Sequence, residues 1–266
     1  MYHKHNIIVS YNIVTDLLQD KEEVLMVGVI LAAGDGKRLK NSKDEACCKP
    51  LVKVNEKNLI DYALDNLIQL EISEAYVVIG KEGHLIKSTL GNEYKSIRLN
   101  YVCQHEQKGL MNAFLQALNA MENDEAVVLQ LSDEIFVDLK SEQIRSMIKD
   151  KKADFYCGVT PEDNPEKIKN NFSVETDSDS FLIKCTEKPQ VVTDNIKGTG
   201  FSIFNNKTIK VIKDTYKTNP EKLFDLCDSF NYLVASGYKG LTFPVAEKEF
   251  NINTLCDFSE AEEYLK

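Results

Sequence analysis

Apolar and polar positions along the chain form blocks that predict strands and helices in alternation. Four mostly apolar runs are typical of strands buried on both faces of a parallel sheet: residues 27–32, 75–79, 99–102 and 126–131. Between them, apolar residues recur at helical spacing in two groups, which are Leu59, Ile60, Ala63, Leu64, Leu67 and Ile68, then Leu110, Ala113, Phe114, Ala117 and Leu118. This order predicts an α/β fold with a doubly wound, mostly parallel, Rossmann-like sheet and right-handed crossovers.

The second half of the chain changes to an antiparallel pattern. Residues 172–175 and 181–185 flank Asp177-Ser178-Asp179, which predicts a hairpin. The elements expected after it are a strand at 201–204, a helix around Ile209 and Ile212, an amphipathic helix over 223–235 that ends before Gly237, a strand at 241–245 and a helix at 258–265. We expect residues 1–25 to form an N-terminal extension without an assigned role. Residues 26–266 would form one domain, with the hairpin as an elaboration of its sheet.

Composition and charge exclude several classes of protein. The formal net charge of −10 argues against a general nucleic-acid binder, although a nucleotide site needs only a few local cations. No run approaches the roughly 18 apolar residues of a membrane span, and the apolar patch at 7–9 is too short for a signal peptide. None of the seven cysteines forms a C-x-x-C pair, which favours buried free thiols over zinc ligands. We therefore expect a cytoplasmic protein without a nucleic-acid or membrane partner.

The loop after the first predicted strand has the composition of a phosphate-binding loop. Gly34 and Gly36 carry no Cβ, so the main chain there can bring its N–H groups close to an anion. Arg38 follows and is one of three arginines in the chain, with a planar set of donors suited to phosphate oxygens. The loop predicts a site for a phosphorylated ligand.

Further polar residues follow the other predicted strands. Because ligands of open parallel sheets bind beyond the carboxyl ends of the strands, we expect one crevice to collect Gln104, Gly109, Asp133, Glu187, Lys188, Asn251 and Asn253. Asp133 would be a magnesium ligand or, alternatively, an N-cap of a following helix. Lys49 precedes Pro50, which disfavours a helical conformation for Lys49. Its alternative role is that of an ordinary solvated lysine.

In this order and at these spacings, the residues resemble those of nucleotidyltransferases of the sugar-1-phosphate type. The resemblance covers nearly all of residues 27–266. The matching positions are Gly34, Gly36, Arg38, Lys49 and Pro50 for G-x-G-x-R followed by K-P, Gln104, Gly109, Leu110 and Ala113 for Q-x-x-x-x-G-L-x-x-A, Asp133 for the strand-ending aspartate, and Glu187, Lys188 and Pro189 for E-K-P.

The resemblance implies a glycosyltransferase-A-like fold, Mg²⁺ as cofactor and a set of site residues. The catalytic residues would be Arg38, Lys49 and Asp133. The nucleotide would be bound by Leu31, Ala32, Ala33, Gly34, Gly36, Gln104 and Gly109. The acceptor would be bound by Glu187, Lys188 and Gly200, and the metal by Asp133 with Asn251 first and Asn253 second.

The reaction implied is the attack of a phosphomonoester on the α-phosphorus of a nucleoside triphosphate, with release of pyrophosphate. The second pKa of a phosphate monoester is about 6, so the nucleophile is already anionic at neutral pH and needs no general base. Three positions depart from the family pattern. Ser132-Asp133-Glu134 replaces Gly-Asp-Asn, Cys48 replaces a proline, and asparagines stand where the second metal ligand is often aspartate.

The identity of both substrates stays open at this point. The acceptor would be a sugar 1-phosphate or another small phosphomonoester such as phosphocholine, and the amide of Gln104 favours a pyrimidine base, with CTP first. Because the chain ends shortly after the predicted domain, we expect a stand-alone enzyme that supplies cell-surface polysaccharide or secondary-metabolite assembly. Formation of a homo-oligomer is left open.

Two other functions compete with this interpretation. A dinucleotide-binding oxidoreductase would need a third glycine where Leu39 stands, and an acidic residue after the second strand, where Gly80-Lys81 stands. A non-catalytic relative with the same fold would explain Asn251 and Asn253, but it leaves Arg38, Lys49 and Asp133 without a reason. Release of pyrophosphate by the pure protein would discriminate between them.

Overall fold

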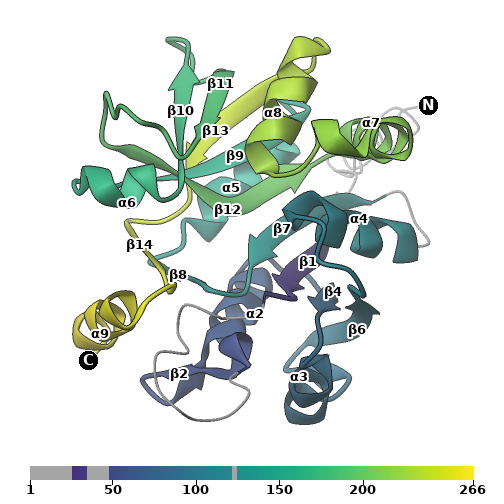
Figure 1. Cartoon of the computed structure of the whole chain (residues 1–266), viewed down its shortest axis with the longest axis vertical. Helices are drawn as coiled ribbons and strands as arrows, with labels where there is room; N and C mark the ends of the chain where they lie inside the picture. Colours follow the sequence, from purple (N-terminus) through teal and green to yellow (C-terminus); the bar gives the residue numbers. More distant parts are fainter. Residues whose placement is uncertain (1–25, 35–47, 122–124) are drawn as a thin grey trace, which may run out of the picture.

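The computed structural model describes residues 26–34, 48–121 and 125–266 (Figure 1). Its elements in chain order are β1 (Met26–Ala32), η1 (Lys49–Leu51), β2 (Lys53–Val54), β3 (Lys57–Asn58), α2 (Leu59–Gln69), β4 (Glu74–Ile79), α3 (Gly83–Leu90), β5 (Glu93–Tyr94), β6 (Ile97–Cys103), α4 (Leu110–Ala120), β7 (Ala126–Leu131), β8 (Glu134–Val137), α5 (Ser141–Lys149), β9 (Phe155–Pro161), α6 (Pro165–Lys169), β10 (Phe172–Thr176), β11 (Leu182–Glu187), β12 (Ile196–Phe204), α7 (Asn206–Thr218), η2 (Pro220–Lys222), α8 (Leu226–Ala235), β13 (Gly240–Pro244), β14 (Lys248–Asn251) and α9 (Leu255–Tyr264).

An eight-stranded sheet forms the centre of the fold, in the order β13-β9-β12-β7-β1-β4-β6-β5. β1 pairs in parallel with β4 and with β7, and β4 pairs in parallel with β6. β12 runs antiparallel between β7 and β9, and the short β5 runs antiparallel to β6. The predicted α/β fold with a mostly parallel, doubly wound sheet is confirmed, and so is the antiparallel hairpin, which is formed by β10 and β11.

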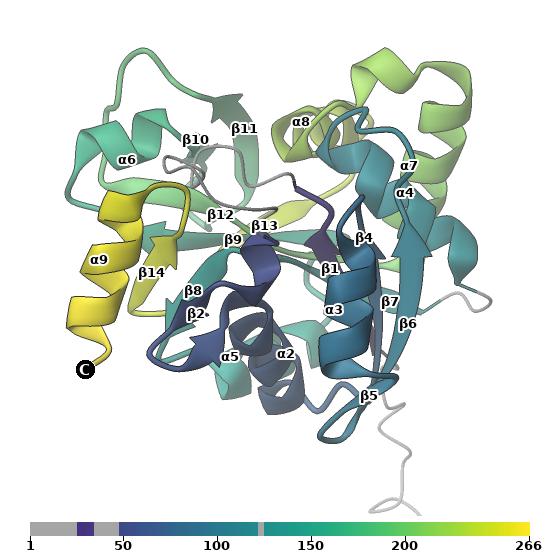
Figure 2. The same ribbon diagram turned by 60° about the horizontal axis from the view of Figure 1, so that its bottom comes forward.

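Helices cover both faces of this sheet. Figure 2 shows α2, α3 and α5 on one side and α4, α7 and α8 on the other. Alternate residues of β1 supply both layers, because successive side chains of a strand point to opposite faces. Ile30 packs in one cluster with Ile60 of α2, and Val29 packs in the other with Phe114 of α4. The continuous apolar run of β1 is explained by this burial on both faces.

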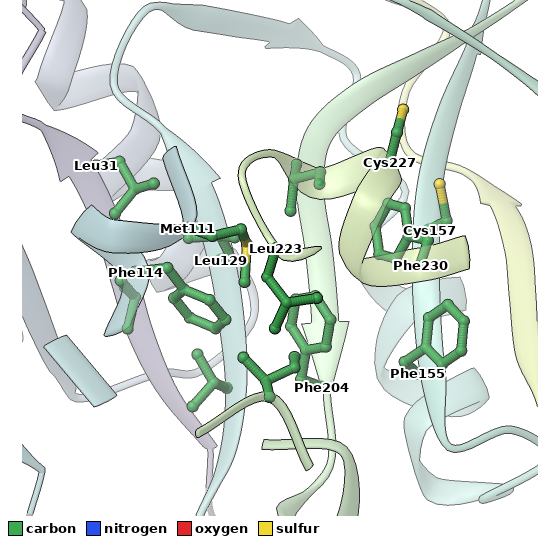
Figure 3. Packing of buried hydrophobic residues seen from close by; sticks show 14 of the residues in the cluster. Leu31, Met111, Phe114, Leu129, Phe155, Cys157, Phe204, Leu223, Cys227 and Phe230 are labelled. Atoms are coloured by element: carbon green, nitrogen blue, oxygen red, sulfur yellow. The ribbon is translucent and has the colours of Figure 1, made fainter. Parts of the chain in front are cut away.

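Aromatic rings fill the layer beneath α4 and α8. Figure 3 shows Phe155, Phe204 and Phe230 in this cluster. The ring centroids of Phe155 and Phe230 lie 5.5 Å apart, and those of Phe204 and Phe230 lie 6.0 Å apart, both in stacked arrangements. Such pairs contribute about 0.5–1.5 kcal/mol each beyond the burial of their area. They fix α8 against β9 and β12.

Two small strands lie outside the main sheet. β8 and β14 pair only with each other, antiparallel, with Asn251 opposite Glu134 and Lys248 opposite Val137. We call this pair of strands the β8–β14 ribbon. Its apolar side chains Ile135 and Phe250 pack with Val54 and with Ala261 of α9. Figure 2 shows α9 next to β14, at the C-terminal end of the chain.

Two sequence expectations are corrected at the level of local structure. The amphipathic helix begins at Leu226 and not at residue 223, because Asp225 caps it and the turn η2 precedes it. Lys49 begins a 3₁₀ turn and is not extended. Pro50 has no N–H, so the turn closes through Leu51 N, which donates to Cys48 O at 2.9 Å, and Val52 N, which donates to Lys49 O at 3.1 Å.

Among the helices of the described residues, none combines the length and the apolar character needed to cross a bilayer.

Candidate active site

The β8–β14 ribbon brings two distant polar segments together at one end of the main sheet. Asp133 precedes β8, and Asn251 ends β14. The ladder continues by one hydrogen bond beyond the strands, from Ile252 N to Asp133 O at 2.9 Å. Asn253 therefore lies next to Asp133. Because Asp133 leads into a strand, its alternative role as a helix N-cap is wrong.

Lys49 joins these two segments. Its Nζ forms an ion pair with Asp133 Oδ2 and donates a hydrogen bond of 3.1 Å to Asn253 Oδ1. The Lys49 side chain is 11% exposed and that of Asp133 is 22% exposed, so this is not an ordinary solvated lysine. Asn253 Nδ2 in turn donates to Asn251 Oδ1 at 2.6 Å. The structure thus gathers Lys49, Asp133, Asn251 and Asn253 into one polar network, as their positions at strand ends predict.

Asn171, which sequence reasoning missed, connects this network to the predicted acceptor segment. Its Oδ1 accepts a hydrogen bond from Asn251 Nδ2 at 3.2 Å, and its main-chain oxygen accepts one from Lys188 N at 2.7 Å. Lys188 has a positive φ of 45°, which turns the chain sharply after β11. An asparagine in a loop carries no signal by itself, and its role depends on the pairing of segments that are distant in sequence.

Glu187 and Lys188 lie at the end of β11 beside α8. Lys188 Nζ is 3.4 Å from Glu187 Oε1. Burial raises the pKa of Glu187, and repulsion from Asp225 at the start of α8 adds to this, while Lys188 opposes it. Cys227 Sγ also contacts Glu187 Oε2 at 3.9 Å. The two carboxylates thus favour positive charge or a hydrogen-bond donor beside them.

Of the residues predicted to bind the nucleotide and its phosphates, some lie within the described part of the chain and others do not. Gly36 and Arg38 lie outside the described residues. The side chains of Leu31, Ala32 and Ala33 are buried, whereas Gly34 is exposed at the end of β1. Among the described ones, Leu31 belongs to the core cluster that contains Phe114.

The loop between β6 and α4 is tied to its surroundings by side-chain amides. Gln104 is 8% exposed, and its Nε2 donates to Asn112 Oδ1 at 3.0 Å. Gln107 Nε2 donates to Ala33 O at 2.9 Å, which joins this loop to the end of β1. Gly109 has φ of 94°, and an added Cβ would lie 2.8 Å from Phe224 O, so both its angle and the close approach require glycine. In this structure the Gln104 amide nitrogen donates its hydrogen bonds within the protein, to Gly109 O at the end of the loop and to Asn112 of α4.

Behind Asp133 lies a buried cluster of ionisable residues that the sequence did not reveal. Glu134 is 1% exposed, and its two carboxylate oxygens accept hydrogen bonds from Gly200 N at 2.8 and 3.0 Å. Lys197 pairs with Glu249, and its Nζ lies 3.9 Å from Glu162 Oε2. Gly200 is predicted to bind the acceptor, but in this structure its N–H donates to the Glu134 carboxylate.

The pKa values of two carboxyl groups in this cluster, those of Glu134 and Glu249, are raised. Burial raises the pKa of Glu134 well above its ordinary value, and the charges of Glu249 and Asp133 add to the effect. Burial also raises the pKa of Glu249, although Lys197 opposes it. Strands of four residues with a buried glutamate give no periodic signal, so this cluster could not be found from the sequence pattern.

In the described part of the chain, no three His, Cys, Asp or Glu side chains lie close enough to hold a metal ion together. A site of one carboxylate with amide oxygens is not excluded by this. The six described cysteines are free thiols, as expected, but burial was expected too widely: Cys157, Cys185 and Cys227 are buried, Cys48 is half-buried, and Cys103 and Cys256 are exposed.

A profile described as "Nucleotidyl transferase" matches residues 27–250, which is most of the chain. This chain belongs to the nucleotidyl transferase family. Asp133, Lys49 and Glu187 all lie inside the matched region, and the enzyme class predicted from the motifs is therefore confirmed.

Other members of the family are similar over much of their length. This nucleotidyltransferase is 27% identical over 212 residues to UTP–glucose-1-phosphate uridylyltransferase AglF of Haloferax volcanii, covering 80% of this chain and 85% of AglF. It is 26% identical over 245 residues to the bifunctional protein GlmU of Thermodesulfovibrio yellowstonii, covering 90% of this chain and 52% of GlmU. The chain thus spans about half the length of that GlmU.

Solved structures share the fold of this nucleotidyltransferase. A proposed glucose-1-phosphate thymidylyltransferase from Bacillus anthracis has a TM-score of 0.78 at 22% identity, covering 90% of this chain and 94% of that one. UDP-glucose pyrophosphorylase in complex with UDP-glucose has a TM-score of 0.76 at 16% identity, covering 91% and 98%. Both support the mixed, mostly parallel sheet described above.

Proposed function

We propose that this nucleotidyltransferase joins the nucleotidyl group of UTP to a sugar 1-phosphate and releases pyrophosphate. The observation that carries the proposal is the position of the Lys49 ammonium between Asp133 and Asn253. A cation already lies there between a carboxylate and an amide oxygen, and the N–H of Ser132, the neighbour of Asp133, donates to Leu31 O near the end of β1 at 3.1 Å. That is the arrangement needed to neutralise phosphate charge.

The oxygens around Lys49 fit a magnesium site. Asp133 and Asn253 would hold Mg²⁺, since this ion prefers hard oxygen ligands and takes one or two protein groups together with substrate phosphates and water. Asn251 would orient the second ligand, because it accepts the amide N–H of Asn253 and leaves the Asn253 oxygen on the side of Asp133. The network therefore favours Asn253 over Asn251 as the ligand. Magnesium, when bound, would stabilise the charge that develops on the phosphates.

The residues of the chain then have separate tasks. Lys49 would leave Asp133 for the phosphate oxygens when the metal binds, and it would keep the two substrates in line for attack. Glu187 and Lys188 would bind the acceptor, with the Lys188 ammonium toward its phosphate and the Glu187 carboxylate toward its hydroxyl groups. No residue must remove a proton, because the attacking phosphate is already ionised at neutral pH.

The choice of UTP as donor departs from the CTP expected from Gln104. AglF carries UTP in its name and aligns with 80% of this chain. A further relative from Aneurinibacillus thermoaerophilus, 26% identical over 173 residues that cover 65% of this chain and 72% of its own, is a heptose 1-phosphate guanylyltransferase. The names of these relatives support a sugar 1-phosphate as acceptor and give CTP no support.

The test is a matrix of UTP, CTP, ATP, GTP and dTTP against sugar 1-phosphates and phosphocholine, read by pyrophosphate release. We expect the largest rate with UTP and a sugar 1-phosphate, and loss of activity with a chelator. A largest rate with CTP and phosphocholine would overturn the proposed substrates. No release with any pair, by protein that still binds nucleotide, would favour the non-catalytic alternative.

A further inference from the structure

The β8–β14 ribbon has two faces with different chemistry. Ile135 and Phe250 lie on the face that packs against α9 and β2. Glu134 and Asn251 are opposite each other in the ladder, so they share the other face, and Glu249 shares it because it is two residues before Asn251. One face of the ribbon is thus held by apolar packing. The other face combines these polar groups with Phe136, which is opposite Glu249 and whose ring centroid lies 5.8 Å from that of Phe201 in β12.

The polar groups of this second face are attached to β12 at two points, one from each strand of the ribbon, in addition to the contact of Phe136 with Phe201. Glu134 of β8 accepts the N–H of Gly200, which is available because the pairing between β12 and β9 is irregular between Gly198 and Ser202. Glu249 of β14 pairs with Lys197, and both side chains are almost completely buried, at 1% and 3% exposed. Each strand of the ribbon therefore has its own link to the same strand of the main sheet.

Lys197 faces two carboxylates directly. Its Nζ pairs with Glu249 and lies 3.9 Å from Glu162 Oε2, whereas Glu134 accepts the N–H of Gly200 on the same strand as Lys197. Without the lysine, the buried carboxylates of Glu249 and Glu162 would have no cation between them. Repulsion of this kind is strong in a site from which water is excluded.

We propose that Lys197 is a positioning residue for the metal-binding segment of this enzyme. Through Glu249 it holds β14 in register, so that Asn251 stays opposite Glu134 and Asn253 stays next to Asp133. Lys197 itself does not touch substrate or metal. This inference rests on the proposed function for the identity of the metal ligands. The link between Lys197 and the ribbon rests on the observed ion pair alone.

Two variants separate this role from a general effect on stability. Lys197→Met leaves Glu249 buried without its partner and is expected to lower stability. The double variant Lys197→Met with Glu249→Met replaces the ion pair by apolar side chains, and such replacements often keep or raise stability. Lys57→Met is the matched control, because it breaks a different ion pair, 2.5 Å long, between β3 and Asp65 of α2.

The first readout is the Mg²⁺ concentration that gives half-maximal pyrophosphate release. Mutation of residues that orient metal ligands typically weakens metal affinity 10- to 100-fold. We therefore expect the half-maximal Mg²⁺ concentration to rise about tenfold in both Lys197 variants, with little change in the KM for the acceptor. Lys197→Arg should recover part of the loss. The Lys57→Met control should have the wild-type requirement.

The second readout needs neither metal nor turnover. Hydrogen exchange of the metal-free protein should be faster over residues 248–253 in the double variant, with unchanged exchange in β1 and β4. A wild-type Mg²⁺ requirement and wild-type exchange in the double variant would overturn the role of Lys197, even if Lys197→Met alone failed to fold. Absence of pyrophosphate release by the wild-type protein would instead reject the proposed function, and exchange alone would then decide whether Lys197 holds the ribbon.

Discussion

Lys49 has a position that its residue type alone does not explain. In this structure it neutralises Asp133 and contacts Asn253, which are residues from segments 84 and 204 positions away in the chain. Pro50 shapes the turn that delivers it, and Cys48 precedes that turn in an extended conformation. Under the proposed function, a lysine held in this way would meet the nucleotide phosphates beside the proposed metal ligands.

The first prediction concerns this pair of charges. Lys49→Ala and Asp133→Ala should each lower the rate of pyrophosphate release by orders of magnitude, since each removes charge stabilisation from the transition state. Cys48→Ala, which changes a neighbour of Lys49, should change the rate little. Steady-state rates with saturating Mg²⁺ and substrates provide the measurement. Near-normal release by Asp133→Ala would contradict its assignment as metal ligand.

At the scale of residues, site residues could be predicted where they belong to a motif or follow a predicted strand. Asp133 after its predicted strand, Lys49 before Pro50, and Asn251 and Asn253 before the last helix do meet in one network. Asn171 joins that network through contacts made across the fold, and no local pattern distinguishes it from other loop asparagines. Side chains that link two predicted segments depend on tertiary pairing, which spacing does not encode.

At the scale of elements, the strands β1, β4 and β7 and the helices α2 and α4 are predicted by the sequence pattern, whereas β9, α3, α5 and the β8–β14 ribbon are not. β1, β4 and β7 are apolar runs because helices cover both of their faces. β8 and β14 have four residues each, and both place a glutamate at a buried position. Their charges are compensated by Lys197 and by the N–H of Gly200, so a rule based on hydrophobic pattern fails where ion pairing replaces apolar burial.

The second prediction concerns the start of α8. Asp225 caps this helix, and its Oδ1 accepts the N–H of Asp228 at 2.9 Å. Asp225→Ala should lower the free energy of unfolding by about 1 kcal/mol through loss of the cap. Asp225→Asn keeps a capping oxygen and removes the charge that repels Glu187, so it should be at least as stable as the wild type at pH 7. Urea denaturation of both variants measures the difference, and equal losses would show that the cap is not the cause.

The third prediction concerns the acid stability of the contact between α2 and the turns beside it. Asp65 of α2 pairs with Lys57 at 2.5 Å and with Lys95 at 2.6 Å. Burial alone would raise the pKa of Asp65, but the hydrogen bonds and charges of the two lysines lower it below 3.8. A lowered pKa in the folded state means that this contribution is present above about pH 4 and is lost as the pH falls through the folded-state pKa.

Asp65→Asn is the variant that isolates this contribution. It should reduce the free energy of unfolding by about 1 kcal/mol at pH 7, as expected for two partly exposed ion pairs. The difference from the wild type should shrink as the pH falls below about 4. Glu106→Gln, which breaks an ion pair with Lys108 that is exposed to solvent, serves as the control and should show no such change. A difference that is constant from pH 7 to pH 3 would exclude the ionic origin.

At the scale of the whole molecule, the site draws on both ends of the chain. η1 supplies Lys49, β8 follows Asp133, and the residues just before α9 supply Asn253. The protein carries a formal net charge of −10, so its overall field repels a triphosphate. Under the proposed function, nucleotide binding would therefore depend on Lys49 and on the proposed metal at this point.

The last prediction follows from this arrangement. A ligand that binds the folded state at 100 times its dissociation constant adds about 2.7 kcal/mol of stability, which corresponds to roughly 5–10 °C in Tm for a chain of this size. UTP with Mg²⁺ should therefore raise the Tm, measured by calorimetry, and a chelator should remove most of the increase. Asn253→Ala should reduce the increase with Mg²⁺ while leaving the Tm without ligand nearly unchanged, because Asn253 is itself partly exposed and Lys49 keeps Asp133 as its partner. An equal increase in wild type and variant would mean that UTP binds without this asparagine, and the metal would then have to be held by Asp133 and the phosphates alone.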